Sequence, residues 1–237
     1  MDLWRLRNGI IWAGRVKAHE ANAIVGGLSE PSKMPGWGYG LPARECKLGS
    51  KLVKVKGSTC SGCYCLKNRY VMGHVQKAQY RRLRALKDPK WVEAMARLIN
   101  GKRCKWFRWH DSGDLQSLRH LLKIIRVAEL TPTVQHWLPT REYEIVKRYL
   151  HGPLEKFQGL EFPPNLTVRL SAHMVDGPHP VELGLPTSGV HTPKGTFQDH
   201  FKGQGGVTCP ARSQGNKCGE CRACWDPKVR SVSYELH

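Results

Sequence analysis

The sequence lacks any apolar run approaching the roughly 18 residues that a membrane-spanning helix needs. Its first residues carry only a short apolar stretch, which Arg15 and Lys17 interrupt, so the unbroken core of a secretory signal is missing. A repeat of fixed period is missing too, as are the glycine signatures of dinucleotide-binding and nucleotide-binding loops. These absences predict a soluble protein of the reducing cytoplasm that has no membrane partner.

Acidic residues are scarce, because 19 Asp and Glu stand against 38 Lys and Arg, a formal net charge of +19. Such an excess creates a positive surface potential that attracts polyanions, nucleic acid above all. Solvated basic faces, or charge that offsets bound anions such as thiolate-ligated clusters, give the same composition. The basic residues are spread along the chain rather than gathered in one block, so both interpretations stay open.

The composition is that of a globular protein, with 40% hydrophobic and 24% charged residues in a chain of 237. This length allows either one α/β domain or two smaller domains. We expect a single domain of three parts. Residues 1–40 form a lead-in, residues 41–208 an α/β partial barrel, and residues 209–237 a cysteine-rich, metal-binding tail.

Nine cysteines carry most of the chemical information. In a reducing compartment, clustered thiols bind metal more often than they form disulfides. Four of them lie in the tail with a C-x2-C-x2-C core, namely Cys209, Cys218, Cys221 and Cys224. That core is typical of cubane iron–sulfur ligation, whereas structural zinc more often uses two separated C-x2-C pairs. The tail is therefore predicted to bind an iron–sulfur cluster, with zinc as the alternative metal.

A second group of cysteines has the spacing C-x2-C-x-C and consists of Cys60, Cys63 and Cys65. It lies between a predicted strand at residues 51–57 and a predicted helix at residues 66–86. Cys46 precedes it by fourteen positions, so a four-iron cluster here either has its fourth iron closed by Cys46 or leaves that iron open. Lys67 and Arg69 follow the group and are expected to lower the thiol pKa values.

The middle of the chain alternates between strand and helix patterns. Strands are predicted at residues 104–109, 133–139 and 165–173, and helices at residues 88–101, 115–125 and 140–150. The connections are long enough for parallel crossovers, so we expect an α/β fold, most economically a partial or irregular barrel of the TIM type. Residues 176–208 are expected to be loop.

Polar side chains follow each of the three predicted strands in the middle of the chain. They are His110, Asp111 and Asp114 after the first, Thr140 and Arg141 after the second, and Ser171 and His173 after the third. Because parallel strands end at a common edge, these residues predict an active-site rim with Asp111, Asp114, Arg141 and Ser171 as candidate catalytic groups. Asp114 and Thr140 are equally interpretable as helix caps, and Arg141 as a solvated residue of a first helical turn.

The order of strand, cysteine loop, helix, strand and small-Gly-acid turn resembles the front half of the radical S-adenosylmethionine enzymes. By that resemblance Cys60, Cys63 and Cys65 would hold a cubane cluster, and Ser112, Gly113 and Asp114 would bind the methionine amino group of S-adenosylmethionine. Those enzymes space their cysteines as C-x3-C-x2-C, whereas this loop reads C-x2-C-x-C.

A second resemblance covers residues 36–225 and is to the bacteriophage "gene product 88" family. It is carried in order by "LPARECKLG" (41–49), "CSGCYC" (60–65), "FRWHDSGDL" (107–115), "WLPTR" (137–141), "VRLSAH" (168–173) and "CPARSQGNKCGECRACW" (209–225). The resemblance implies a distant relative of the radical S-adenosylmethionine barrel, encoded by a phage or prophage and acting in the host cytoplasm.

Two hypotheses of function follow. The first is an iron–sulfur protein with one or two four-iron clusters and a redox or radical-type role, in which enzymatic activity stays open. The second is a binding module without catalysis, in which metal is a structural staple and the basic surface binds nucleic acid or a host protein.

Overall fold

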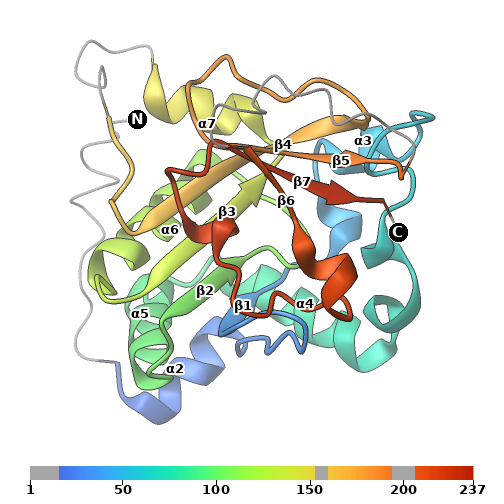
Figure 1. Ribbon diagram of the computed structural model, residues 1–237. Helices are drawn as coiled ribbons and strands as arrows, with labels where there is room; N and C mark the ends of the chain where they lie inside the picture. Colours follow the sequence, from blue (N-terminus) through green and yellow to red (C-terminus); the bar gives the residue numbers. More distant parts are fainter. Residues whose placement is uncertain (1–15, 153–159, 194–205, 237) are drawn as a thin grey trace.

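The computed structural model describes residues 16–152, 160–193 and 206–236 (Figure 1). Its centre is one sheet of seven parallel strands in the order β1-β2-β3-β4-β5-β7-β6. The strands are β1 (Trp37–Tyr39), β2 (Trp106–Trp109), β3 (Gln135–Thr140), β4 (Leu166–Val175), β5 (Thr187–His191), β6 (Gly206–Thr208) and β7 (Ser231–Glu235). Within the described residues β1 does not pair with β6. The α/β class is therefore confirmed, but the sheet is open and no closed TIM-type barrel is formed.

Helices connect the strands. They are α2 (Ala18–Val25), the short α3 (Gly49–Leu52), α4 (Gly73–Ala85), α5 (Trp91–Gly101), α6 (Leu118–Leu130) and α7 (Tyr143–Leu150). In the part of the chain that the structure describes, none of the helices has the length and apolarity needed to cross a membrane.

The two faces of the sheet have different coverings, and β2 shows why. Successive side chains of a strand point to opposite faces. Phe107 and Trp109 are fully buried in the larger core, which also takes in apolar residues of α2, α5, α6 and α7. Trp106 packs on the other face, where the tail residue Trp225 inserts and donates from Nε1 to the Phe107 carbonyl at 3.0 Å. The tail thus supplies a core of its own, on the side of the sheet away from α5 and α6.

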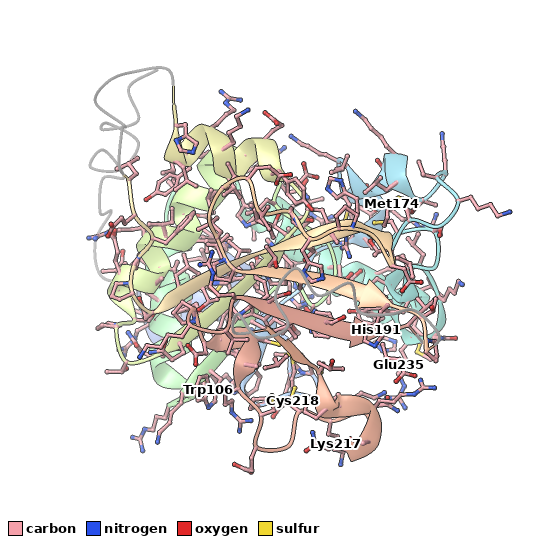
Figure 2. All side chains as sticks on the ribbon, turned by 45° about the horizontal axis from the view of Figure 1, so that its top comes forward. Trp106, Met174, His191, Lys217, Cys218 and Glu235 are labelled. Carbon is pink, nitrogen blue, oxygen red and sulfur yellow. The ribbon has the colours of Figure 1, made fainter. Side chains whose placement is uncertain are left out.

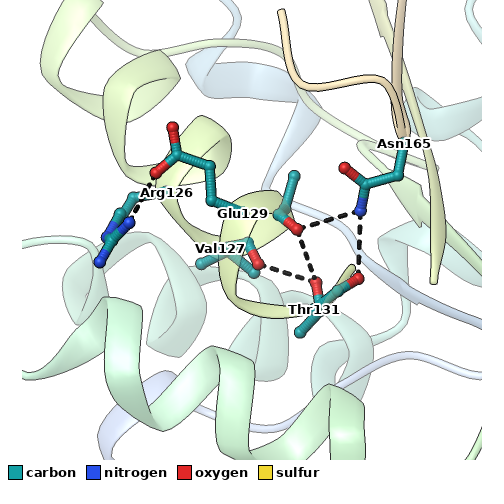
Figure 3. A network of polar contacts seen from close by, with 6 residues as sticks. Arg126, Val127, Glu129, Thr131 and Asn165 are labelled. Carbon is teal, nitrogen blue, oxygen red and sulfur yellow. Dashed lines mark hydrogen bonds and ion pairs between the residues drawn. The ribbon is translucent and has the colours of Figure 1, made fainter. Parts of the chain in front are cut away.

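Hydrogen bonds fix both ends of α6. Ser117 caps its start by accepting from the His120 amide at 3.1 Å. At its end, Asn165 Nδ2 donates to the carbonyls of Ala128 and Thr131 at 3.0 and 3.1 Å, as Figure 3 shows. Because Asn165 directly precedes β4, these bonds tie the start of that strand to the end of α6. The interpretation of Asp114 as the cap of this helix is wrong, since Ser117 has that role.

The predicted strands at residues 104–109, 133–139 and 165–173 correspond to β2, β3 and β4. The strand predicted at residues 51–57 is wrong, because α3 and turns occupy that stretch. Val53 and Val55 are 37% and 43% exposed, so their alternation with lysines does not mark a buried face.

Other segments were misjudged because their strands are short. The prediction of loop at residues 176–208 is wrong where β5 and β6 form, and residues 194–205 lie outside the described part. The expected lead-in of residues 1–40 contributes α2 and β1, while its first 15 residues are likewise outside the described part.

Candidate metal centres

A long connection between β1 and α4 carries the first cysteines across the carboxyl ends of the strands. Ser58 forms an antiparallel bridge with Met174, and the Thr59 amide donates to the His173 carbonyl at 2.8 Å. Tyr64 Oη donates to the Asp111 carbonyl at 3.1 Å. The cysteine loop is thereby attached to the ends of β2 and β4, at the edge where a parallel sheet presents its functional groups.

Four thiols gather in this loop, and we call them the rim site: Cys46, Cys60, Cys63 and Cys65. Two of them lie beside Gly49. A Cβ added to that glycine would be 3.6 Å from Cys46 Sγ and 3.7 Å from Cys60 Sγ. Negative charge at Cys60 and Cys63 also raises the pKa of Cys46. Cys46, distant in the sequence, is therefore a member of the same group.

Burial dominates the titration of this group. It raises the pKa of Cys46 well above its usual range, and it raises the pKa of Cys60 against the lowering effect of the Arg141 charge. The expectation that Lys67 and Arg69 lower these pKa values is wrong, since both side chains are exposed to solvent and the thiols are largely shielded from it.

Cys63 and Cys65 behave as a pair. A hydrogen bond between their side chains lowers the pKa of Cys63 to about 6 and raises that of Cys65, whose burial acts in the same direction. Cys65 is 7% exposed, and its Sγ also lies 3.5 Å from the Asp111 carbonyl oxygen. At neutral pH Cys63 is thus the member of this pair that favours the thiolate form, which is the form that binds metal.

Asp114 joins the ends of β2 and β3 beneath the rim site. Its carboxylate accepts from Thr140 Oγ1 at 2.6 Å, from the Arg141 amide at 2.9 Å and from the Leu115 amide at 2.7 Å. Burial raises the pKa of Asp114 to about 6, although these hydrogen bonds favour the charged form. Arg141 in turn donates from Nε to Thr59 Oγ1 at 2.9 Å, next to Cys60. Asp114 and Arg141 therefore lie together at the predicted edge.

The other predicted rim residues each contact a different partner. Asp111 accepts from Tyr70 Oη at 3.4 Å through Oδ2, and Ser112 favours the thiolate of Cys65. Gly113 adopts a φ of +82° with Leu41 against it, so a Cβ there would lie 2.6 Å from Leu41 Cβ. Ser171 bonds Ser188 on β5 at 3.0 Å. The catalytic and S-adenosylmethionine-binding roles of these residues stay predictions.

The four tail cysteines also come together, and we call them the tail site: Cys209, Cys218, Cys221 and Cys224. The Cys218 amide donates to the Lys33 carbonyl at 2.9 Å, and Cys224 Sγ contacts Tyr234 Oη at 3.1 Å. Burial raises the pKa of Cys224 to about 11, and negative charge at Cys209 raises it further. Figure 2 shows Cys218 on the C-terminal segment, beside Lys217.

Two arginines inside strands adjoin the tail site and were missed from the sequence. Arg169 is fully buried, and its guanidinium donates to the carbonyls of Thr187, Ala223, Asp226 and Val229. Arg108 stacks over the Trp137 ring at 4.4 Å. Neither forms a salt bridge among the described residues, and in both the buried Nε has no hydrogen-bond partner there. The signal was an arginine between buried neighbours in "WFRW" and "TVRL".

Arg108 links the two groups of thiols. Burial opposes its charge, but Tyr64, Asp111 and Tyr234 outweigh burial and raise the pKa of its guanidinium. Burial raises the pKa of Cys218, and the positive charge of Arg108 opposes this rise. Tyr64 and Asp111 belong to the surroundings of the rim site, whereas Tyr234 and Cys218 belong to those of the tail site. The two sites therefore lie within the electrostatic reach of one arginine.

All nine cysteines are free thiols. In the described part of the chain, no three or more His, Cys, Asp or Glu side chains are arranged so that they could hold a metal ion. Metal binding at the rim site and the tail site therefore stays a prediction.

Comparison with known proteins gives one result. The family model of gene product 88 matches residues 13–227, which supports the predicted phage origin. No curated protein and no solved structure matches the chain. The resemblance to radical S-adenosylmethionine enzymes gains no support from these comparisons. The chain, matched over most of its length, belongs to the gene product 88 family.

Proposed function

We propose that the protein is a redox iron–sulfur protein, with a four-iron cluster held by Cys46, Cys60, Cys63 and Cys65 and a second cluster in the tail. One observation carries the proposal. Eight of the nine cysteines gather in two groups of four, although Cys46 lies apart from its group in the sequence and Cys209 from its own. When bound, such clusters supply reversible one-electron transfer.

The surroundings of the thiols fit anionic clusters. A buried guanidinium without a carboxylate partner is costly unless another negative charge offsets it. Arg169 is such a group beside the tail site, the half-buried Arg108 lies near Cys218 with Asp111 as a charge partner, and Arg141 lies beside Cys60 at the rim site. A four-iron cluster with four thiolate ligands carries net negative charge and would compensate these arginines.

Cysteine spacing favours iron–sulfur over zinc in this proposal. The tail has a C-x2-C-x2-C core, which is typical of cubane ligation, whereas structural zinc more often uses two separated C-x2-C pairs. The hydrogen-bonded pair of Cys63 and Cys65 at the rim site suits either metal. Zinc stays the alternative metal.

The position of Cys46 bears on the role. A fourth cysteine closes the fourth iron, which leaves no open position for S-adenosylmethionine and favours electron transfer over radical chemistry. Asp114 supports the same interpretation, because both its carboxylate oxygens already accept hydrogen bonds from the protein. In this proposal Asp114 and Arg141 position the cysteine loop and set the charge beside it.

The experiment is electron paramagnetic resonance on protein purified without air and reduced with dithionite. We expect brown protein and a four-iron signal that added S-adenosylmethionine does not shift, with no 5′-deoxyadenosine formed. The Cys46→Ser variant opens one iron, so its signal should differ from that of the wild type. Colourless protein containing zinc would refute the proposal, and a shift with 5′-deoxyadenosine in the wild type would refute closure by Cys46.

A further inference from the structure

The surface over the rim site is basic. We call it the loop face: the exposed side chains of residues 44–72 together with Met174. Seven exposed basic side chains belong to it, namely Arg44, Lys47, Lys51, Lys54, Lys56, Lys67 and Arg69. Its exposed acidic residue, Glu45, accepts a hydrogen bond from Tyr80 Oη at 3.0 Å. Figure 2 shows nitrogen-tipped side chains projecting into solvent from the pale blue segment near Met174.

The loop face is also apolar, which a merely solvated charged surface would not be. Nine large hydrophobic side chains are exposed in the described part of the chain, and six of them belong to this face: Val53, Val55, Tyr64, Val71, Met72 and Met174. Tyr64 is 54% exposed and Met72 is 48% exposed. Met174 belongs with the others because Ser58 forms a bridge with it, and a connection that exposes both cations and large apolar side chains suits an interaction partner.

We propose that the loop face binds single-stranded nucleic acid. Lysine and arginine neutralise phosphates, while exposed aromatic and apolar side chains receive unpaired bases. In a duplex the base faces are already stacked on one another, so the exposed apolar side chains would have no base to contact. The combination of seven exposed cations with six exposed apolar groups thus favours a single strand over a double helix.

Contacts with Asp111 and Tyr70 fix the position of the Tyr64 ring. Its Oη donates to the Asp111 carbonyl at 3.1 Å, and its ring lies edge-on to Tyr70 with 5.6 Å between centroids. Tyr70 is itself bonded to the Asp111 carboxylate. A ring that is already fixed loses little conformational entropy when a base stacks on it. The loop face shares its segment with the rim site, because Tyr64 lies between Cys63 and Cys65 and its Oη bonds the same Asp111 carbonyl that Cys65 Sγ contacts, but the proposal needs no metal at that site.

The experiment is fluorescence anisotropy with a labelled 20-nucleotide DNA strand of mixed sequence, the same sequence as RNA, and the DNA duplex. If about four phosphates are neutralised, the affinity for single strands should fall about 50-fold between 50 and 200 mM salt. The single strands should bind more tightly than the duplex.

Charge reversal locates the surface. Lys54→Glu with Lys56→Glu should weaken single-strand binding at 50 mM salt by at least about tenfold. The matched control, Lys87→Glu with Lys90→Glu, makes the same change in net charge at exposed positions outside the loop face and should have a much smaller effect. Equal iron contents and circular dichroism spectra would show that both variants are folded.

Tyr64 tests the mode of binding. Tyr64→Ala should weaken single-strand binding about 5- to 100-fold, while Tyr64→Phe keeps the ring and should bind like the wild type. The proposal is overturned by failure to bind any of the three probes at 50 mM salt, or by equal losses in the two charge-reversal pairs. Duplex binding as tight as single-strand binding, with no effect of Tyr64→Ala, would also overturn it and would indicate binding through the phosphates alone.

Discussion

The rim site and the tail site are alike in having four cysteines and unlike in what surrounds them. The rim site lies in a loop over the carboxyl edge of the sheet, beneath an exposed, basic surface. The tail site lies against a buried core in which Trp137, Trp225 and Val232 pack on the sheet. The tail cysteines thus lie in a segment that packs into the core, whereas the rim cysteines lie in a loop that crosses the edge of the sheet.

This difference predicts a division of roles. Losing the tail site should disturb the packing of one whole face of the sheet. Trp225 packs on that face, and carbonyls that accept from Arg169 lie in the same segment. Losing the rim site should change the chemistry at the edge and leave most of the core in place. The predictions below test this contrast, beginning with the largest expected effect.

Cys221→Ser should destabilise the protein most. Metal binding that is coupled to folding contributes about 10 kcal/mol or more at four-thiolate sites, and most of it would be lost with one ligand. We expect lower metal content and faster proteolysis of the C-terminal segment, measured by metal analysis and limited digestion. Cys104→Ser, which alters the remaining cysteine, is the control. Wild-type metal content and protease resistance in Cys221→Ser would contradict the assignment.

Arg169→Lys should lower the free energy of unfolding by about 3–5 kcal/mol, measured by urea denaturation. The substitution keeps the charge, but an ammonium cannot reach the four carbonyls that the guanidinium joins. Arg44→Lys makes the same change at an exposed position and should be nearly neutral. A loss below about 1 kcal/mol would show that the hydrogen bonds of Arg169 do not hold the tail on the sheet.

Acid should destabilise the helix-covered side of the sheet. Burial lowers the pKa of His120 and His136 to about 3, and that of His110 well below 6.5. Because the folded-state pKa values are depressed, the neutral histidines contribute stability above pH 6.5, and this stability is lost as the pH falls towards 3. Each contributes a slope of about 1.4 kcal/mol per pH unit in that window.

His120→Asn tests that slope. The Asn carbonyl can replace Nδ1, which accepts from the Gln116 amide at 3.3 Å, but it does not titrate. Between pH 4 and 6 we measure the free energy of unfolding by urea denaturation. Its slope against pH should correspond to about one proton less in the variant than in the wild type. An unchanged slope would mean that His120 is not the neutral, buried group described above.

Gly49→Ala should have the smallest effect on stability and a selective effect on the rim site. The added Cβ would lie 2.8 Å from Cys46 Cβ, so Cys46 must shift. We expect a cost of about 1–2 kcal/mol and an altered rim-site signal, with the tail site unaffected. Gly62→Ala is the matched control, since no heavy atom beyond its two chain neighbours lies within 4 Å of its added Cβ. Equal spectra for the two variants would contradict the placement of Cys46.

The strands β2, β3 and β4 could be predicted because each carries a run of apolar and aromatic residues that ends in a polar turn. The edge on which their polar residues meet followed from the parallel order. The strand at residues 51–57 was mistaken because alternating lysine and valine also occurs where both sets of side chains are exposed. β1 has only three residues, and β7, with the sequence SVSYE, lacks the run of apolar residues that marks β2.

The candidate sites divide in the same way. Spacing alone grouped the tail cysteines, whereas the place of Cys46 beside Cys60 follows from the packing of both around Gly49. Arg108 and Arg169 could not be predicted as site residues, because their importance depends on which elements cover the inner face. Likewise, the basic residues looked evenly spread, yet the structure leaves seven of those at residues 44–69 exposed, on the same connection as most of the exposed apolar groups.

The most direct test of the central claim is the iron and acid-labile sulfide content of protein purified without air. Two four-iron clusters predict about eight iron and eight sulfide per chain, falling to about half in Cys63→Ser and in Cys221→Ser separately. Sulfide-free protein, or iron contents that neither substitution changes, would contradict the account.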